Sequence, residues 1–131
     1  KIPMAQPNIV NVANIYGQSV GATLTTSYFA FITVTAEYVV KVNSIIVSNI
    51  DGSNAATCDI KLVKPDATPV GITNWTLTDT IQLAKTVNVP ADDILVVIDT
   101  PFYMMEGDAL SALASAAGDL DILISFEAIT D

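Results

Sequence analysis

The stretch Val39–Val63, with the sequence VVKVNSIIVSNIDGSNAATCDIKLV, decides the fold. In its second half, Cys58, Ile60 and Leu62 alternate with polar residues, which is the period-two pattern of a half-buried strand. In its first half, we expect Val40, Val42, Ile46 and Ile50 to share one face and Lys41, Asn43 and Asn49 to lie on the other. The intervening DGSN contains Gly and Asn, which tolerate the positive φ angles of tight turns. We therefore predict a β-hairpin, and with it a β-sheet protein.

Other parts of the chain show strand patterns at intervals of about ten residues. They are residues 8–16, 28–35, 81–89, 94–98, 109–115 and 120–127. The Ala content of residues 109–115 favours a helix, but turn signals on both sides favour a strand. Ala117-Gly118-Asp119 has the composition of a second hairpin turn. The spacing predicts an all-β fold, a β-sandwich or jelly-roll-like Greek key of about seven or eight antiparallel strands.

The length of 131 residues indicates a single domain. We expect residues 1–16, which contain Pro3 and Pro7, to form an extended N-terminal arm with a possible first strand. Residues 17–131 would form the sandwich. The single Cys58 falls on the inward side of its strand, so we expect a buried free thiol and no internal disulfide. This fits synthesis in a reducing compartment.

The charge balance argues against two classes of partner. The chain has 14 acidic residues, five Lys and no His, for a net charge of −9. Nucleic-acid phosphates and anionic membranes would repel such a surface, so we expect neither as a partner. We expect no membrane anchor, because no apolar run approaches the length of about 20 residues that a membrane helix needs. We also expect no signal peptide, because no charged segment is followed by an apolar one of the required kind.

The sequence gives little support for an enzyme. His and Arg are absent, and there is no Gly-rich phosphate loop and no nucleophile motif. We predict no catalytic residue, no cofactor and no metal. Three acidic clusters offer a weak alternative as Ca²⁺ ligands, namely Asp51-Gly52-Ser53-Asn54, Asp92-Asp93 and Asp119-Leu120-Asp121. The first lacks the later acidic ligand of a calcium loop, the side chains of Asp92 and Asp93 would point apart in an extended chain, and Asp119 and Asp121 fall on a solvent face by alternation. We therefore interpret all three as solvated turns and faces.

Two regions are candidates for partner binding. Ile94–Ile98 is apolar on both faces, and Phe102-Tyr103-Met104-Met105 follows it closely. Both either fill the core or form a subunit interface, where Met and aromatic residues are enriched. Trp75, the only tryptophan, lies in the long Pro-containing connection between Lys64 and Asp79. It either packs that connection onto the sandwich or contacts a partner.

Four motifs resemble a known family. They are Ser44-Ile45-Ile46-Val47-Ser48-Asn49, Val89-Pro90-Ala91, Tyr103-Met104-Met105-Glu106-Gly107-Asp108 and Ser125-Phe126-Glu127-Ala128-Ile129. With the strands around them, they are similar to small virion structural proteins of tailed bacteriophages, especially those of marine, cyanophage-like genomes. The resemblance covers nearly the whole chain from Met4 onward. Met104 and Met105 in the bend, and Phe126 and Ala128 near the end, depart mildly from the family pattern.

The resemblance implies a capsid decoration (cement) protein, made in the host cytoplasm and located on the capsid surface of the virion. Its partners would be the major capsid protein and further copies of the chain, with a homotrimer favoured. The arm Met4–Tyr16 would lie on the shell, and Ile94–Met105 would form the oligomer contact. The alternative is a neck, tail or fibre component, including a receptor- or sugar-binding knob. The candidate partner-binding residues are Ile9, Val10, Ile15, Tyr16, Trp75, Phe102, Tyr103, Met104 and Met105.

Overall fold

A computed structural model of the protein describes residues 13–65, 69–76 and 78–131. Within these residues the chain forms nine strands and no helix. The strands are β1 (Asn14–Thr23), β2 (Phe29–Thr33), β3 (Val39–Asn49), β4 (Ala56–Val63), β5 (Thr80–Val89), β6 (Ile94–Ile98), β7 (Phe102–Met104), β8 (Ala109–Ala114) and β9 (Leu120–Thr130). The predicted all-β class is confirmed, and the Ala-rich residues 109–114 form a strand as expected.

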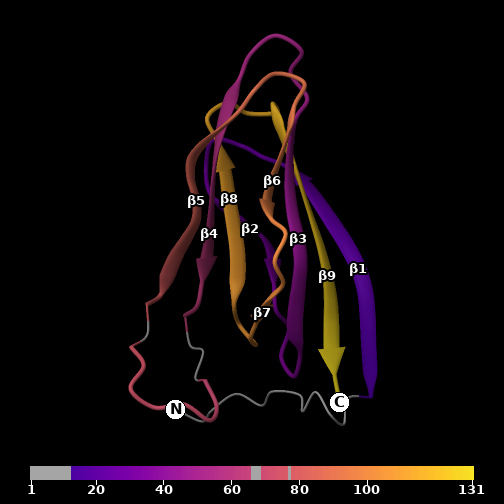
Figure 1. Ribbon diagram of the computed structural model, residues 1–131, viewed down its shortest axis with the longest axis vertical. Coiled ribbons are helices and arrows are strands. Elements are labelled where there is room, and N and C mark those ends of the chain that lie inside the picture. Colours follow the sequence, from indigo (N-terminus) through magenta and orange to yellow (C-terminus); the bar gives the residue numbers. More distant parts are fainter. Residues whose placement is uncertain (1–12, 66–68, 77) are drawn as a thin grey trace.

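The strands form two antiparallel sheets that pack face to face (Figure 1). Sheet A has the order β1-β9-β3-β6, and β7 also pairs with β3. Sheet B has the order β2-β8-β4-β5. The prediction of a β-sandwich is therefore confirmed. We expected a first strand over residues 8–16, of which 8–12 lie outside the described residues. β1 begins at Asn14 and continues to Thr23 in sheet A, so it extends well past the end that we expected.

The order of the strands follows from one long hairpin rolled on itself. β1 pairs with β9, β2 with β8, β3 with β6 and β4 with β5, so the chain doubles back at the connection between β4 and β5. Rolling this ribbon brings β9 beside β3 and β8 beside β4, which produces the two sheets. This is the arrangement of a jelly roll.

The predicted hairpin over Val39–Val63 is wrong in its pairing. Both strands exist, but β3 belongs to sheet A and β4 to sheet B, so they face each other across the core. The turn at residues 117–119 likewise connects sheet B to sheet A. Alternation reveals which face of a strand is buried, but not which edge finds a partner.

Asn49 fixes the first crossing, because its side-chain amide donates to the carbonyls of Asn54 and Val89 at 3.0 and 2.9 Å.

The core lies between the sheets and is built from the inward side of each strand. Fully buried members include Val42, Ile45, Val47, Cys58, Ile60, Met104, Leu110, Leu120 and Ile124. Cys58 is a free buried thiol. Burial, with a smaller effect of the Asp59 charge, raises the pKa of the Cys58 thiol to about 11. The thiol is therefore protonated and inert at neutral pH.

Candidate functional site

The predicted partner-binding residues are spread over three parts of the molecule. Ile15 and Tyr16 lie on β1, Tyr103 on β7 and Trp75 in the β4–β5 connection, and all four are exposed. Phe102 is partly buried against the core, Met105 is half-buried and Met104 is fully buried. Ile9 and Val10 lie outside the described residues. Met104 therefore contributes to the core of this chain.

The outer face of sheet A carries a row of apolar side chains that crosses the sheet. Leu123 on β9 pairs with Ile46 on β3, and Ile46 pairs with Val96 on β6. Leu123 is 45% exposed and Val96 is 54% exposed. Ile94, which is 62% exposed, extends the row along β6. We name Ile46, Ile94, Val96 and Leu123 the apolar row.

One part of this surface was visible in the sequence and another was missed. The continuous apolar run Ile94–Ile98 predicted a strand with two apolar faces. Leu95 and Val97 do pack against the core, which leaves Ile94 and Val96 outside. Leu123 was overlooked. Its signal was an apolar residue at an outward position of β9, between the inward Ile122 and Ile124.

The apolar row has a polar border. A shallow groove of about 590 Å³ lies over it, lined by Gly21, Ala22, Thr23, Ile46, Ser48, Ile94, Asp121, Ile122 and Leu123. Beside the apolar row, the hydroxyl of Thr23 on β1 donates to the carboxylate of Asp121, its paired residue on β9, at 2.7 Å. An apolar centre with a polar rim is the usual composition of a protein–protein contact.

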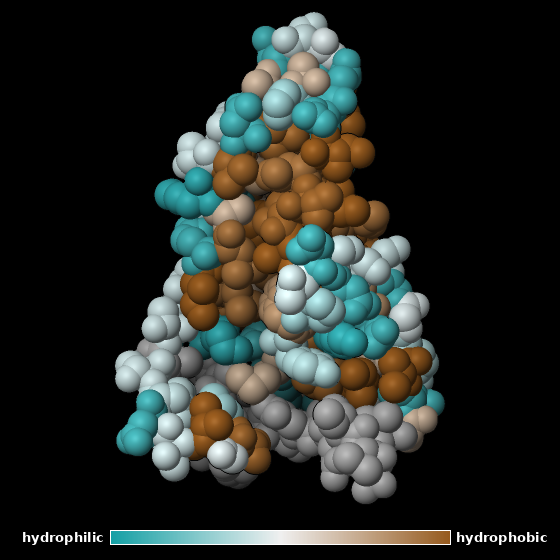
Figure 2. Space-filling model, in the orientation of Figure 1, coloured by the Kyte–Doolittle hydropathy of each residue, from teal (hydrophilic) through white to brown (hydrophobic). Residues whose placement is uncertain are grey.

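Hydrophobic residues are also visible where the two sheets meet on the β5–β6 side. Figure 2 shows them over β6 and the space between β6 and the β4–β5 pair, in the upper half of the view. The partly buried residues there that pack against the core are Leu83, Val87, Leu95, Val97 and Ile98. On this side of the sandwich, these side chains of β5 and β6 cover the core and are partly exposed themselves.

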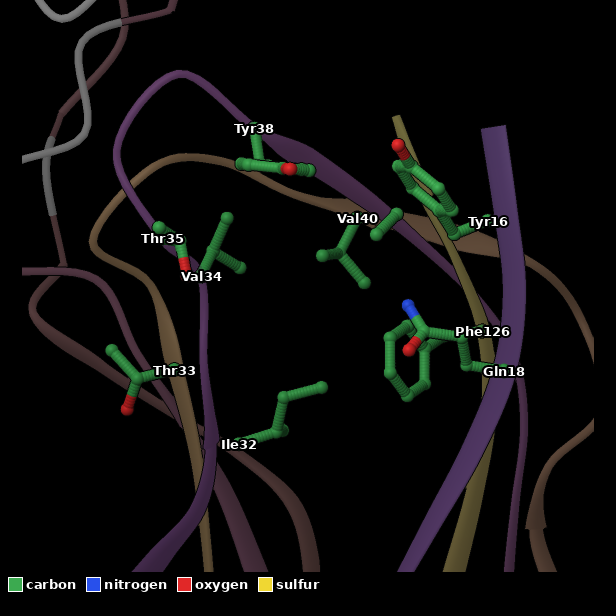
Figure 3. A pocket seen from close by; sticks show the side chains of 10 residues that line it. Tyr16, Gln18, Ile32, Thr33, Val34, Thr35, Tyr38, Val40 and Phe126 are labelled. Carbon is green, nitrogen blue, oxygen red and sulfur yellow. The ribbon is translucent and has the colours of Figure 1, made fainter. Parts of the chain in front are cut away.

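The opposite side of the sandwich, between β1 and β2, has a hollow. Its volume is about 470 Å³, and its lining includes Tyr16, Gln18, Ile32, Tyr38, Val40 and Phe126. In Figure 3 the side chains of Gln18 and Ile32 project toward this space from opposite walls. Tyr16 and Gln18 are on the inward side of β1 yet are exposed, because sheet B does not cover them. The hollow offers room for an apolar side chain.

A polar cluster on sheet B is centred on Asp59. Its carboxylate accepts bonds from the Thr86 amide at 2.9 Å, the Lys85 ammonium at 3.1 Å and the Tyr28 hydroxyl at 3.5 Å. Burial acts to raise the pKa of Asp59, but these donors outweigh it and hold the pKa below its ordinary value. Lys61 lies over the Tyr28 ring at 3.9 Å from its centroid. These bonds connect β4 to β5 and to Tyr28, the residue before β2.

A second carboxylate, Asp108, is fully buried. Its Oδ2 atom accepts bonds from the Lys64 ammonium and from the Met105 amide. Its Oδ1 atom has no hydrogen-bond partner within the described residues. The Asp108–Lys64 pair ties the end of β4 to the turn between β7 and β8.

In the acidic turns that we considered as ion ligands, Asp51 and Asp93 accept bonds from backbone amides, and Asp121 accepts a bond from the Thr23 hydroxyl. Asp51 accepts bonds from the amides of Ser53 and Asn54 at 2.8 and 3.3 Å, which caps the turn. Among the described residues, no group of three or more His, Cys, Asp or Glu side chains is placed to hold a metal ion. Nor does this part of the chain contain a helix long and apolar enough to cross a membrane.

Comparisons of the chain with protein-family models, with curated proteins and with solved structures find no match.

Proposed function

We propose that this chain is a structural protein of a tailed-bacteriophage virion, and specifically a capsid decoration protein. It binds the major capsid protein on the head surface and associates with further copies of itself, with a trimer favoured. Two things support the proposal: the resemblance of the four sequence motifs, and the exposed apolar row on the outer face of sheet A. The second is the observation that carries it.

The apolar row is more than scattered surface hydrophobicity. Single exposed apolar residues are normal on soluble proteins, but a contiguous group with a polar rim marks a contact surface. Covering Ile94, Val96 and Leu123 would remove apolar area from water, at roughly 25 cal/mol per Å² buried. A decoration protein needs such a surface and no reaction chemistry.

Within this proposal the outer face of sheet A makes the contacts of the chain in the assembled virion. The oligomer contact uses the exposed residues of the β6–β7 region, namely Ile94, Val96 and Tyr103. Met104 is excluded from the contact because its side chain is fully buried within the chain.

The test is the copy number of the chain in purified virions, measured by quantitative mass spectrometry against the major capsid protein. A ratio near one per capsid subunit, or one trimer for every few subunits, supports decoration of the head. A count in the low tens points to the neck, tail or fibres and overturns the decoration role. Absence from the particles overturns the virion role entirely.

A matched pair of variants tests the surface itself. Val96→Ser should abolish binding to capsids that lack the protein, because it places a hydroxyl in the centre of the apolar row. Ile50→Ser is the control, since Ile50 is equally exposed but lies in the β3–β4 crossing. If both variants bind like the wild type, the apolar row is not the contact surface.

The β4–β5 connection favours a second candidate function, a sugar- or receptor-binding knob. It exposes three large apolar residues, Val70, Ile72 and Trp75. An exposed indole ring can stack on a sugar ring. On a glycan array, specific binding that is lost in Trp75→Ala and kept in Ile72→Ala would favour this function, and an array without specific binding would reject it.

A further inference from the structure

β1 differs from the other strands at the edges of the two sheets. It is ten residues long, pairs with β9 without a break in register, and contains no charged residue and no proline. Its other edge has no partner strand among the described residues. Natural proteins protect such edges with charges, prolines, bulges or short strands, because an unprotected edge pairs with another chain.

The three other edges each carry such protection. β2 has five residues and a register break between Ala30 and Ile32. β6 and β7 are short and are separated by Asp99-Thr100-Pro101. β5 carries Lys85, and Lys85 and Thr86 together lie opposite the single residue Asp59, which is a β-bulge. β1 is therefore the unprotected edge within the described residues.

The backbone of β1 shows which groups are available for pairing. The Leu24 amide, one residue beyond β1, donates to the Leu120 carbonyl in the same register. Peptide groups in an antiparallel strand alternate between its two edges. Even-numbered residues therefore bond to β9. Ile15, Gly17, Ser19, Gly21 and Thr23 point their N–H and C=O groups to the open edge.

We propose that β1 pairs in antiparallel fashion with β1 of a second copy of this chain, around a two-fold axis at Gln18. Each Tyr16 then lies opposite Val20 of the partner subunit, an aromatic–β-branched pair of the kind that stabilises sheets. Each Ile15 lies opposite the partner's Gly21. The two Gln18 side chains face each other at the axis.

The side chains of β1 are complementary in this register. On the outer face, Ile15 is 57% exposed, whereas Gly21 has no side chain and lies beside Leu123. The partner's Ile15 fills the space above Gly21 and extends the apolar row into the second subunit. On the inner face, Tyr16 and Val20 are both exposed and cover each other. On the outer face a large residue thus lies opposite a glycine, and on the inner face two large residues cover each other.

The occupant is a second copy because β1 is complementary to itself in this register, and charge does not oppose the contact. The chain has a net charge of −9, so most contacts between two copies place like charges together. β1 itself brings no charge to the contact. On the adjacent β9, the Asp121 carboxylate is bonded to Thr23, and Glu127 lies beside Gly17, one strand away from the contact. The inference does not depend on the virion role. A trimer that also used this contact would be joined to neighbouring trimers through β1.

Cysteine cross-linking of the full chain tests both the contact and its register. Gln18→Cys places two thiols at a non-hydrogen-bonded pair, where the Cα atoms are about 4.5 Å apart and a disulfide can form. We expect a disulfide-linked dimer under mild oxidation. The control is Val20→Cys, whose two copies lie roughly 14 Å apart along the strands and should remain unlinked. The wild type, with only buried Cys58, should also remain unlinked.

Light scattering of Ser19→Pro supplies the second measurement. Proline removes the open-edge amide of Ser19 but none of the bonds to β9, and circular dichroism would check that the variant is folded. The mass should fall to half that of the wild type, whether the wild type is a dimer of 13.8 kDa chains or a larger even-numbered assembly. An unlinked Gln18→Cys variant, a link in Val20→Cys instead, or an unchanged mass for folded Ser19→Pro would overturn the proposal. These results leave the copy number per virion untouched.

Discussion

The strands β5 and β1 are both edge strands, β5 of sheet B and β1 of sheet A, yet the chain secures them differently. β5 is held by Asp59, which bonds the Lys85 side chain and the Thr86 amide. β1 is held by its backbone ladder to β9 and by one exposed side-chain bond, from Thr23 to Asp121. In the part of the chain that the structure describes, the buried carboxylates are Asp59 and Asp108, and both bond to β4, β5 or the residue after β4, whereas none bonds to β1.

This difference indicates what each edge is for. A buried carboxylate is costly unless its oxygens are bonded, so it fixes one geometry of the residues around it. Asp59 fixes the bulge of β5, and Asp108 fixes Lys64, the residue that follows β4. The bonds of Asp59 hold the bulge that protects the edge of β5, and the Asp108–Lys64 pair anchors the end of β4. β1 retains a regular, uncharged ladder that a second chain can extend.

The largest expected effect is that of Asp108→Ala. It removes the acceptor of the Met105 amide and leaves the Lys64 ammonium unpaired in a site where only 18% of its side chain is exposed. We expect a loss of about 3 kcal/mol in the free energy of unfolding, at the low end of the range for breaking a buried pair, because Lys64 can reach water. Urea denaturation measures it.

The control for that variant is Asp99→Ala, an exposed position between β6 and β7, where the change should stay within about 0.5 kcal/mol. Equal stabilities of the two variants would show that the Asp108–Lys64 pair does not anchor β4.

A direct comparison of the two edges comes from Asp59→Ala and Asp121→Ala. Removing Asp59 leaves the Thr86 amide without its acceptor at a residue held at a positive φ of 52°, so we expect a loss of about 2 kcal/mol. Removing Asp121 breaks one exposed bond and should cost less than about 1 kcal/mol. The measurement is thermal or urea unfolding of both variants. A larger loss in Asp121→Ala would reverse the comparison.

Acid titration sharpens the role of Asp59. Its pKa in the folded protein is lower than its ordinary value of 3.8, because the donors outweigh burial. The carboxylate therefore contributes stability above about pH 4, and this contribution is lost as the pH falls through the folded pKa. Asp59→Asn should lose less stability than the wild type between pH 5 and pH 3. Parallel curves for the two proteins would contradict the shift.

The sequence predicted the layers of the fold better than its connections. Alternation in β4 and β9 correctly identified the buried faces, and turn spacing identified a sandwich. In β3 it placed Ile46 and Ile50 on the buried face with Val40 and Val42, which is wrong. The register shift between Val42 and Ser44 turns Ile45, Val47 and Asn49 inward and leaves Ile50 exposed. The same alternation failed for the turn between Asn49 and Ala56, which crosses between sheets. The local pattern of apolar residues cannot distinguish a hairpin within one sheet from a crossing between two sheets, because either arrangement buries the same side chains. The decision depends on β9 and β8, which come from the far end of the chain.

The candidate surfaces were predicted in part for the same reason. The doubly apolar run of β6 pointed to an outward apolar face, and Tyr103 is exposed as an interface residue would be. Composition alone does not show which of Tyr103 and Met104 belongs to the core and which to the surface. Neighbouring residues on a strand point to opposite sides, and here Met104 points inward. The unprotected edge of β1 was invisible, because edges exist only once the strand order is known.

The smallest expected effect is that of Lys85→Ala, and it asks what protects the β5 edge. The Lys85 side chain is 69% exposed, so its ion pair with Asp59 should contribute less than about 1 kcal/mol to the free energy of unfolding. The Thr86 amide keeps its bond to Asp59, and the bulge persists. We therefore expect the variant to associate no more than the wild type in concentration-dependent light scattering. If it does form larger species while Ser19→Pro does not, the charge of Lys85 protects that edge, and the bulge alone does not. The contrast between the two edges would then rest on a single lysine.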